Sequence, residues 1–229
     1  MTNEKDSAVT IVIAYVFNLI LLCVFTLFLV LRIVRVRGWK NFPFFHRGIM
    51  VVSNHQTLWD WLISYAVCSF QSALRPIIFG PRAVADMHNY AHKRRYAVFG
   101  SYIIPIDRTG IKQAKTRESR LRLLQNWSNL SKERLDQGGW VILYPETGRT
   151  NSGKTWIYSK LGKKIRPLGS GFSLLASETD CNIFPWWIDW KWYGVDVELG
   201  VPRRRKGDHP KKIAEETEFD LLELADKAG

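Results

Sequence analysis

The stretch GIMVVSNHQTLWDWLISYAVCSF, residues 48–70, carries the pattern that decides the fold. Residues 49–52 form a short apolar run of the kind found in buried strands. A polar turn follows, and Thr57 is a favourable N-cap for a helix over residues 58–70. The stretch therefore predicts a strand, a polar turn and a helix, with the polar residues just beyond the end of the strand.

The same alternation of strand and helix continues along the chain. A charged helical stretch over residues 111–137 ends at Gly138 and Gly139, and an amphipathic helix is expected over residues 213–224. Further short strands are expected at residues 77–79, 103–106, 140–144, 183–188 and 195–199. This order predicts an α/β fold, with a mixed sheet flanked by helices and sites in the loops beyond the strand ends.

The N-terminal segment has the composition of a membrane anchor. Residues 7–31 contain no charged side chain, and a helix of this length spans roughly 36 Å, more than the hydrocarbon core of a bilayer. We expect residues 1–37 to form an N-terminal membrane-anchoring segment, either one helix or a hairpin turned near Asn18. Residues 38–229 then form the α/β domain with a basic C-terminal tail. A basic flank follows the apolar run and consists of Arg32, Arg35, Arg37 and Lys40. Basic residues beside an apolar segment stay on the cytoplasmic side, so we expect the α/β domain to lie on the cytoplasmic face.

Composition limits the classes of partner and scaffold. The 229 residues include 33 Lys and Arg against 21 Asp and Glu, a formal charge of +12, which favours anionic partners. Hydrophobic residues make up 46% of the chain and charged residues 24%, which excludes a disordered protein. Three widely spaced cysteines exclude a disulfide scaffold and a cysteine-based zinc module.

The polar turn after the first strand holds a histidine and an aspartate five residues apart. His55 lies in the turn and Asp60 in the first helical turn, so the carboxylate can reach one imidazole nitrogen. That contact fixes the tautomer and leaves the other nitrogen to take a proton from a hydroxyl. Alternatively, Thr57 and Asp60 form a capping box in which the carboxylate serves only the helix.

Two later loops also follow apolar strands and carry arginine. Arg108 either binds a phosphate through its planar guanidinium or pairs with Asp107. In YPETGRT, residues 144–150, Glu146 can accept a hydrogen bond from a substrate hydroxyl, and Arg149 with nearby amides can hold phosphate. Each loop alone is ordinary, but the three in this order form a specific pattern.

This order of motifs resembles the glycerolipid acyltransferase family. The family's blocks are NHxxxxD, G…FIDR, FPEGTRS and an apolar strand such as VIPV. In this chain they read NHQTLWD (54–60), GSYIIPIDR (100–108), YPETGRT (144–150) and IFPWWI (183–188). The resemblance covers roughly residues 38–202.

The resemblance implies transfer of a fatty acyl group from acyl-CoA or acyl carrier protein to 1-acylglycerol-3-phosphate, which gives phosphatidic acid. His55 would be the catalytic base and Asp60 would orient it. The residues implied in acceptor binding are Arg108, Glu146, Thr147, Gly148 and Arg149. The acyl thioester is a co-substrate, no cofactor is expected, and the expected partners are a lysophospholipid and the lipid bilayer.

One departure from the family leaves the acceptor open. The family's E-G-T-R is E-T-G-R here, with Thr147 and Gly148 exchanged. Three other acceptors are therefore alternatives: glycerol-3-phosphate, a lyso-ornithine lipid or a glycolipid. A non-catalytic, membrane-tethered protein that binds anionic lipid is a further alternative. His88 and His92 are spaced as in zinc helices but lack a third ligand, so no metal site is expected, and no nucleic-acid module is recognised.

Overall fold

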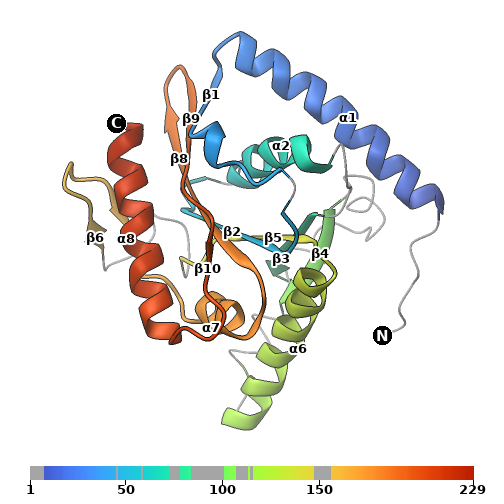
Figure 1. The fold of residues 1–229 in the computed structure, drawn as a ribbon, viewed down its shortest axis with the longest axis vertical. Helices are drawn as coiled ribbons and strands as arrows, with labels where there is room; N and C mark the ends of the chain where they lie inside the picture. The colour runs from blue at the N-terminus through green and yellow to red at the C-terminus, as the bar shows by residue number, and fades with distance from the viewer. Residues whose placement is uncertain are drawn as a thin grey trace.

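The computed structural model describes residues 8–44, 46–57, 59–72, 78–83, 101–106, 113, 116–146 and 156–229. Its centre is an eight-stranded sheet in the order β1-β9-β8-β2-β5-β3-β4, with β10 paired to β8 (Figure 1). The strands are β1 (Val34–Arg37), β2 (Ile49–Ser53), β3 (Ile78–Ala83), β4 (Ser101–Ile106), β5 (Trp140–Leu143), β8 (Asn182–Lys191), β9 (Gly194–Leu199) and β10 (Arg203–Arg204). A separate small sheet pairs β6 (Ile157–Tyr158) with β7 (Lys164–Ile165).

The large sheet is mixed. Strand β2 runs parallel to both of its neighbours, β5 and β8, and β3 runs parallel to β4 and β5. The hairpin formed by β8 and β9 is antiparallel, as is the pairing of β10 with β8. All five residues of β2 are buried, as expected for a central strand covered on both faces.

Helices cover both faces of the sheet. They are α1 (Ala8–Val30), α2 (Asp60–Ser72), α6 (Arg117–Asp136), α7 (Gly171–Glu178) and α8 (Pro210–Ala228), with a short 3₁₀ turn η1 (Trp39–Asn41). One core joins α1 and α2 to the aromatic side of the sheet, where Phe184 and Trp186 lie. The other core joins α6, α7 and α8 to the opposite face. The predicted α/β fold with a mixed sheet between helices is confirmed.

Helix α1 packs on the domain through a narrow stripe. Leu21, Phe25 and Leu29 recur every four residues and meet the aromatic core, where Phe25 is 1% exposed. Most of the other described side chains of α1 are apolar and exposed. None of the helices that the structure describes has the length and apolarity that crossing a bilayer requires.

The segment Val34–Arg37, placed in the anchor by sequence, lies in the sheet as β1. It pairs in parallel with β9, from Val34 opposite Val195 to Arg37 opposite Glu198. The sequence VRVR alternates, so the valines face the core and the arginines face the acidic residues of β9. Arg35 Nε lies 2.6 Å from Asp196 Oδ1, and Arg37 NH1 lies 3.0 Å from Glu198 Oε1. The sheet therefore begins before residue 38.

Candidate active site

The polar turn after β2 lies at the carboxyl end of the central strand, between β5 and β8. Asn54 is fully buried, and its side-chain carboxamide bonds to the backbone of β8 as the backbone of a neighbouring strand would. Its Oδ1 accepts from the Ile188 amide at 2.7 Å, and its Nδ2 donates to the Ile188 carbonyl at 2.8 Å. This pair of bonds continues the β2–β8 pairing by one residue and fixes the point where the turn begins.

Asp60 is fully buried and lies at the first residue of α2, where its carboxylate collects the donors of the turn. Oδ2 accepts from Gln56 N at 2.6 Å and Thr57 N at 2.8 Å, and it lies 2.9 Å from His55 Nδ1. Oδ1 accepts from Thr57 Oγ1 at 3.0 Å. Thr57 Oγ1 in turn accepts from the Trp59 amide at 3.1 Å. The His–Asp contact therefore exists together with one bond of the predicted capping box, from the Thr57 amide to the Asp60 carboxylate, whereas Thr57 Oγ1 accepts from the Trp59 amide.

A tryptophan from β8 completes the shell around the carboxylate. Trp190 Nε1 donates to Asp60 Oδ1 at 2.6 Å, and the Trp190 amide donates to Gln56 Oε1 at 3.4 Å. Trp190 is the last residue on the aromatic face of β8, in register with Val195 of β9. The sheet therefore holds Asp60 from a strand 130 residues away in the sequence.

Glu146 joins the turn to the loop after β7. It is 4% exposed, Oε1 accepts from the His55 amide at 2.8 Å, and Oε2 accepts from the Arg166 amide at 3.0 Å. It also forms an isolated bridge with Leu168. The carboxylate thus holds the backbone of the histidine in place. Its predicted contact with a substrate hydroxyl stays a prediction.

The His55 ring is one quarter exposed and lies against Tyr144, with ring centroids 4.9 Å apart and planes tilted by 31°. Tyr144 Oη donates to Ser64 Oγ at 2.8 Å. Removal from water raises the pKa of the Tyr144 phenol well above its ordinary value, so the ring stays neutral. Tyr144 therefore supports one side of the imidazole as a neutral, hydrogen-bonded wall.

Four of the predicted binding residues, Arg108, Thr147, Gly148 and Arg149, lie outside the described residues. Among the residues predicted for the site, the structure brings together His55, Asp60 and Glu146. In the described part of the chain, no group of three or more His, Cys, Asp or Glu side chains is arranged to hold a metal ion.

Comparison with known proteins identifies the family. The sequence profile described as Acyltransferase matches residues 33–189, which is more than half of the chain. The chain belongs to the acyltransferase family. No curated protein gives a significant match to this acyltransferase. The matched range runs from the turn after α1 almost to the end of β8, so it includes His55, Asp60 and Glu146.

A solved structure shares the fold of this acyltransferase. It is the crystal structure of the 1-acyl-sn-glycerophosphate (LPA) acyltransferase PlsC from Thermotoga maritima. The TM-score is 0.55 at 18% sequence identity, and the match covers 85% of this chain and 71% of that one. The similarity supports the mixed α/β architecture.

Sequence reasoning missed three supporting side chains of this acyltransferase. Trp190 contacts the His–Asp turn from β8, and Tyr144 contacts it from the end of β5. Asn54 holds the turn from within, through its bonds to β8. Alternation along β8 was the available signal, because residues 186, 188 and 190 share one face of that strand. The expected strand ended at residue 188, which left Trp190 outside it.

Proposed function

We propose that this acyltransferase moves a fatty acyl group from an acyl thioester, either acyl-CoA or acyl carrier protein, to the free hydroxyl of 1-acylglycerol-3-phosphate. The product is phosphatidic acid. The observation that carries the proposal is the 2.9 Å contact between His55 Nδ1 and the buried Asp60 carboxylate at the carboxyl end of the central strand. Family membership and the motif order support a glycerolipid as the acceptor.

The proposed chemistry needs one base and no covalent enzyme intermediate. Asp60 accepts a hydrogen bond from Nδ1–H, which keeps that proton on Nδ1 and makes Nε2 the ring nitrogen that takes up a proton. Nε2 removes the proton from the acceptor hydroxyl as its oxygen attacks the thioester carbonyl carbon. The tetrahedral intermediate collapses, the carbon–sulfur bond breaks, and the imidazolium returns the proton to the departing thiolate. Asp60 stabilises the imidazolium during these steps.

Arginines of the two other loops are proposed to bind the acceptor. Arg108 and Arg149 would hold its phosphate, and Thr147 and Gly148 would line the same loop. Such contacts orient the hydroxyl toward His55 and contribute to the rate through positioning. Glu146 would contribute by fixing the His55 amide at 2.8 Å, in addition to the substrate contact expected from the resemblance.

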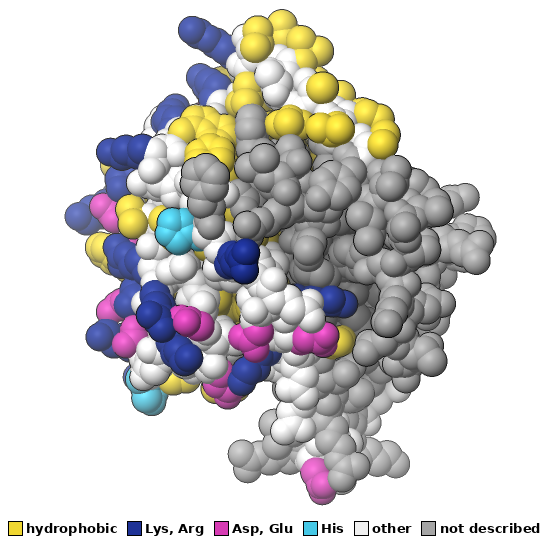
Figure 2. All heavy atoms as spheres, turned by 45° about the vertical axis from the view of Figure 1, so that its right-hand side comes forward, with side chains coloured by type: hydrophobic (Ala, Val, Ile, Leu, Met, Phe, Trp, Pro, Cys, Tyr) yellow, Lys and Arg dark blue, Asp and Glu magenta, His cyan; other side chains and the backbone are white. Residues whose placement is uncertain are grey.

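We also propose that α1 holds the acyltransferase on the cytoplasmic face of a membrane. Figure 2 shows hydrophobic side chains gathered over the upper edge of the molecule, with Lys and Arg side chains beside them. Exposed apolar side chains of α1 include Val16, Leu19, Ile20, Val24, Leu27 and Phe28. A helix that packs one stripe on its own domain and exposes apolar side chains elsewhere is suited to lie in the headgroup region. Exposed Arg32 and Lys40 would favour anionic lipid there.

The proposed reaction is tested with the full chain purified in detergent. Lysophosphatidate is supplied with either acyl-CoA or acyl carrier protein, and product lipids are followed by mass spectrometry. We expect phosphatidate from the parent and a loss of at least ~100-fold in His55→Ala. His46→Ala is the matched control, because His46 is exposed and precedes the amino end of β2, whereas His55 follows its carboxyl end.

The alternatives predict different products. If lysophosphatidate is inert but glycerol-3-phosphate, lyso-ornithine lipid or a lyso-glycolipid is acylated, the chemistry holds and the acceptor changes, as the exchanged Thr147 and Gly148 suggest. If no acceptor is acylated while lipid binding persists in both the parent and His55→Ala, the enzyme proposal fails. A membrane-tethered protein that only binds anionic lipid would then be the better description.

A further inference from the structure

We propose that the tip of the β8–β9 hairpin, together with the end of α1 and the turn after it, is a second contact with an anionic bilayer surface. We call this the tip patch, and its members are Val30, Leu31, Ile33, Trp192 and Tyr193. The proposal rests on the proposed function, since it assumes an acceptor embedded in lipid. It adds a docking point that fixes the distance between the bilayer and His55.

Exposure of a large aromatic side chain is the first observation. Trp192 is 96% exposed, and the neighbouring Tyr193 is 43% exposed. Their rings meet edge to face with centroids 5.3 Å apart. A pair of exposed aromatic rings at a hairpin tip makes almost no contribution to the core. Trp and Tyr rings are favoured at membrane interfaces, where an apolar body and a polar tip are both accommodated.

The tip lies directly against the end of α1. The Val195 amide donates to the Ile33 carbonyl at 2.8 Å, and a side chain at Gly194 would collide with that same carbonyl. Val30, Leu31 and Ile33 are all exposed there. Figure 1 shows the hairpin reaching toward the same end of the molecule as the turn between α1 and β1. The aromatic pair and the end of the apolar helix therefore form one surface.

Charge around the tip patch matches an anionic surface. Arg35 lies with its guanidinium carbon 4.8 Å from the centre of the Tyr193 ring and donates to Tyr193 Oη at 2.7 Å. Arg32, in the turn between α1 and β1, is also exposed. Asp196, the ion-pair partner of Arg35 and Lys191, and Asp189, the partner of Lys163, are both buried. The exposed charge close to the tip is therefore positive.

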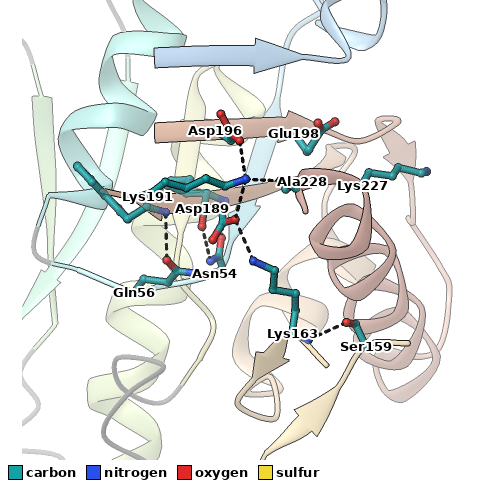
Figure 3. A network of polar contacts seen from close by, with 12 residues as sticks. Asn54, Gln56, Ser159, Lys163, Asp189, Lys191, Asp196, Glu198, Lys227 and Ala228 are labelled. Atoms are coloured by element: carbon teal, nitrogen blue, oxygen red, sulfur yellow. Dashed lines mark hydrogen bonds and ion pairs between the residues drawn. The ribbon is translucent and has the colours of Figure 1, made fainter. Parts of the chain in front are cut away.

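The hairpin is braced beside its tip, so the tip has a fixed position. Lys191 Nζ lies 2.9 Å from Asp196 Oδ2 and donates to the Ala228 carbonyl at 2.9 Å (Figure 3). Lys163 Nζ lies 3.0 Å from Asp189 Oδ2 on the same side. These bonds tie both strands of the hairpin to the end of α8 and to the loop between β6 and β7.

The hairpin also connects the tip to the candidate active site. Trp190, which donates to Asp60, precedes Trp192 by two residues, or about 7 Å of strand at the usual rise. A bilayer surface touching Trp192 would therefore lie close to His55. An acceptor hydroxyl could then reach the base while its acyl chain stays in the membrane.

A fluorescent label at the tip tests the contact without requiring turnover. Trp192→Cys and Phe219→Cys are each made in a Cys23→Ser background, since Cys68 and Cys181 are buried. Phe219 is the matched control, an exposed aromatic residue on α8. An environment-sensitive dye is attached, and vesicles of phosphatidylcholine alone or mixed with phosphatidylglycerol are added. We expect a blue shift and quenching by brominated lipid at position 192, strongest with phosphatidylglycerol, and none at position 219.

An activity measurement accompanies the label. Trp192→Ala should acylate vesicle-embedded lysophosphatidate roughly tenfold more slowly, with an unchanged rate on the detergent-solubilised lipid. Phe219→Ala should match the parent in both. If the detergent assay fails for the parent but the label is quenched, the enzyme proposal falls and the tip contact stands.

Other outcomes overturn the tip contact. A label at position 192 that stays in water while the chain binds vesicles excludes it, as does a chain that binds no vesicles. A label that responds only to acyl carrier protein would make the tip a protein-docking site. A dimer seen by light scattering in the parent and lost in Trp192→Ala would assign the patch to a second copy of the chain.

Discussion

The two oxygens of the Asp60 carboxylate bind both the backbone of the turn before α2 and the side chain of His55. It accepts from the Gln56 and Thr57 amides of the turn before α2, and it lies 2.9 Å from Nδ1 of the His55 ring. Because Asp60 is the first residue of α2 and its carboxylate accepts from two backbone amides of the preceding turn, these bonds tie the turn to the helix. These bonds therefore supply the positional precision that the proposed general base, His55, would require.

Asp60→Asn is expected to lower kcat by about 10²–10⁴-fold. A carboxamide has only one acceptor oxygen, and its NH₂ group would face hydrogen-bond donors that bind the carboxylate in the parent. The His55 imidazole would then lose the hydrogen bond that fixes its tautomer. The measurement is kcat in the lysophosphatidate assay, with the folded state checked by circular dichroism. Asp180→Asn is the control, because Asp180 is an exposed partner of Arg204. An unchanged kcat in Asp60→Asn would remove Asp60 from the mechanism.

Trp190→Phe is expected to lower kcat about 3–30-fold with little change in KM, and to reduce the free energy of unfolding by about 1 kcal/mol. The change keeps an aromatic ring but removes the Nε1 donor that lies 2.6 Å from Asp60 Oδ1. Trp187→Phe is a matched control, since Trp187 is buried and its Nε1 has no hydrogen-bond partner among the residues that the structure describes. Equal kcat values for the two variants would contradict a positioning role for Trp190.

At the scale of elements, α1 is part of the domain core as well as a candidate membrane contact. Its stripe of Leu21, Phe25 and Leu29 closes the aromatic core over Phe184 and Trp186. A helix that only anchored the chain to a membrane would contribute no side chain to that core. The packing instead makes the stability of the sheet depend on α1.

Phe25→Ala is expected to lower the free energy of unfolding by about 3 kcal/mol, because it opens a cavity in the core. Phe28→Ala, three residues further along α1 at a side chain that is 38% exposed, should cost less than about 1 kcal/mol. Urea denaturation in a mild detergent compares the two. Equal losses would show that α1 does not pack on the domain in solution.

Sequence patterns predicted the elements that have clear periodicity. The strand over residues 49–52 and the helix after Thr57 lie where they were expected, because an apolar run and a capping residue are local signals. The strand β1 was missed, since its arginines read as a basic flank of the anchor until their partners on β9 are known. Trp190 was missed for the same reason: its partner, Asp60, is distant in the sequence. Contacts between remote segments carry no local signal.

At the scale of the whole molecule, buried acidic groups predict a loss of stability in alkali. Burial raises the pKa of the Cys181 thiol to about 11, and it also raises the pKa values of Cys68 and Tyr144. Above about pH 9 the unfolded chain releases a proton that folded Cys181 keeps, so the free energy of unfolding falls as the pH rises from about 9 to 11. For Cys181 the loss is on the order of 3 kcal/mol.

Urea denaturation at several pH values checks this expectation. Cys181→Ala should show a shallower decline between about pH 9 and 11, because the titrating thiol is gone. Cys23→Ala should decline like the parent, since Cys23 is exposed. A parallel decline in Cys181→Ala would show that the thiol is ionised equally in the folded and unfolded states.

The pairing of β1 with β9 sets an order of events during translation. Arg35 and its ion-pair partner Asp196 are 161 positions apart, so β1 leaves the ribosome long before the strand it needs. Closing so long a loop is slow compared with forming local structure. The N-terminal helix can therefore meet a membrane first, while this edge of the sheet waits for residues 194–199. Assembly of the sheet would then finish beside the bilayer, with the nascent chain already held at its surface.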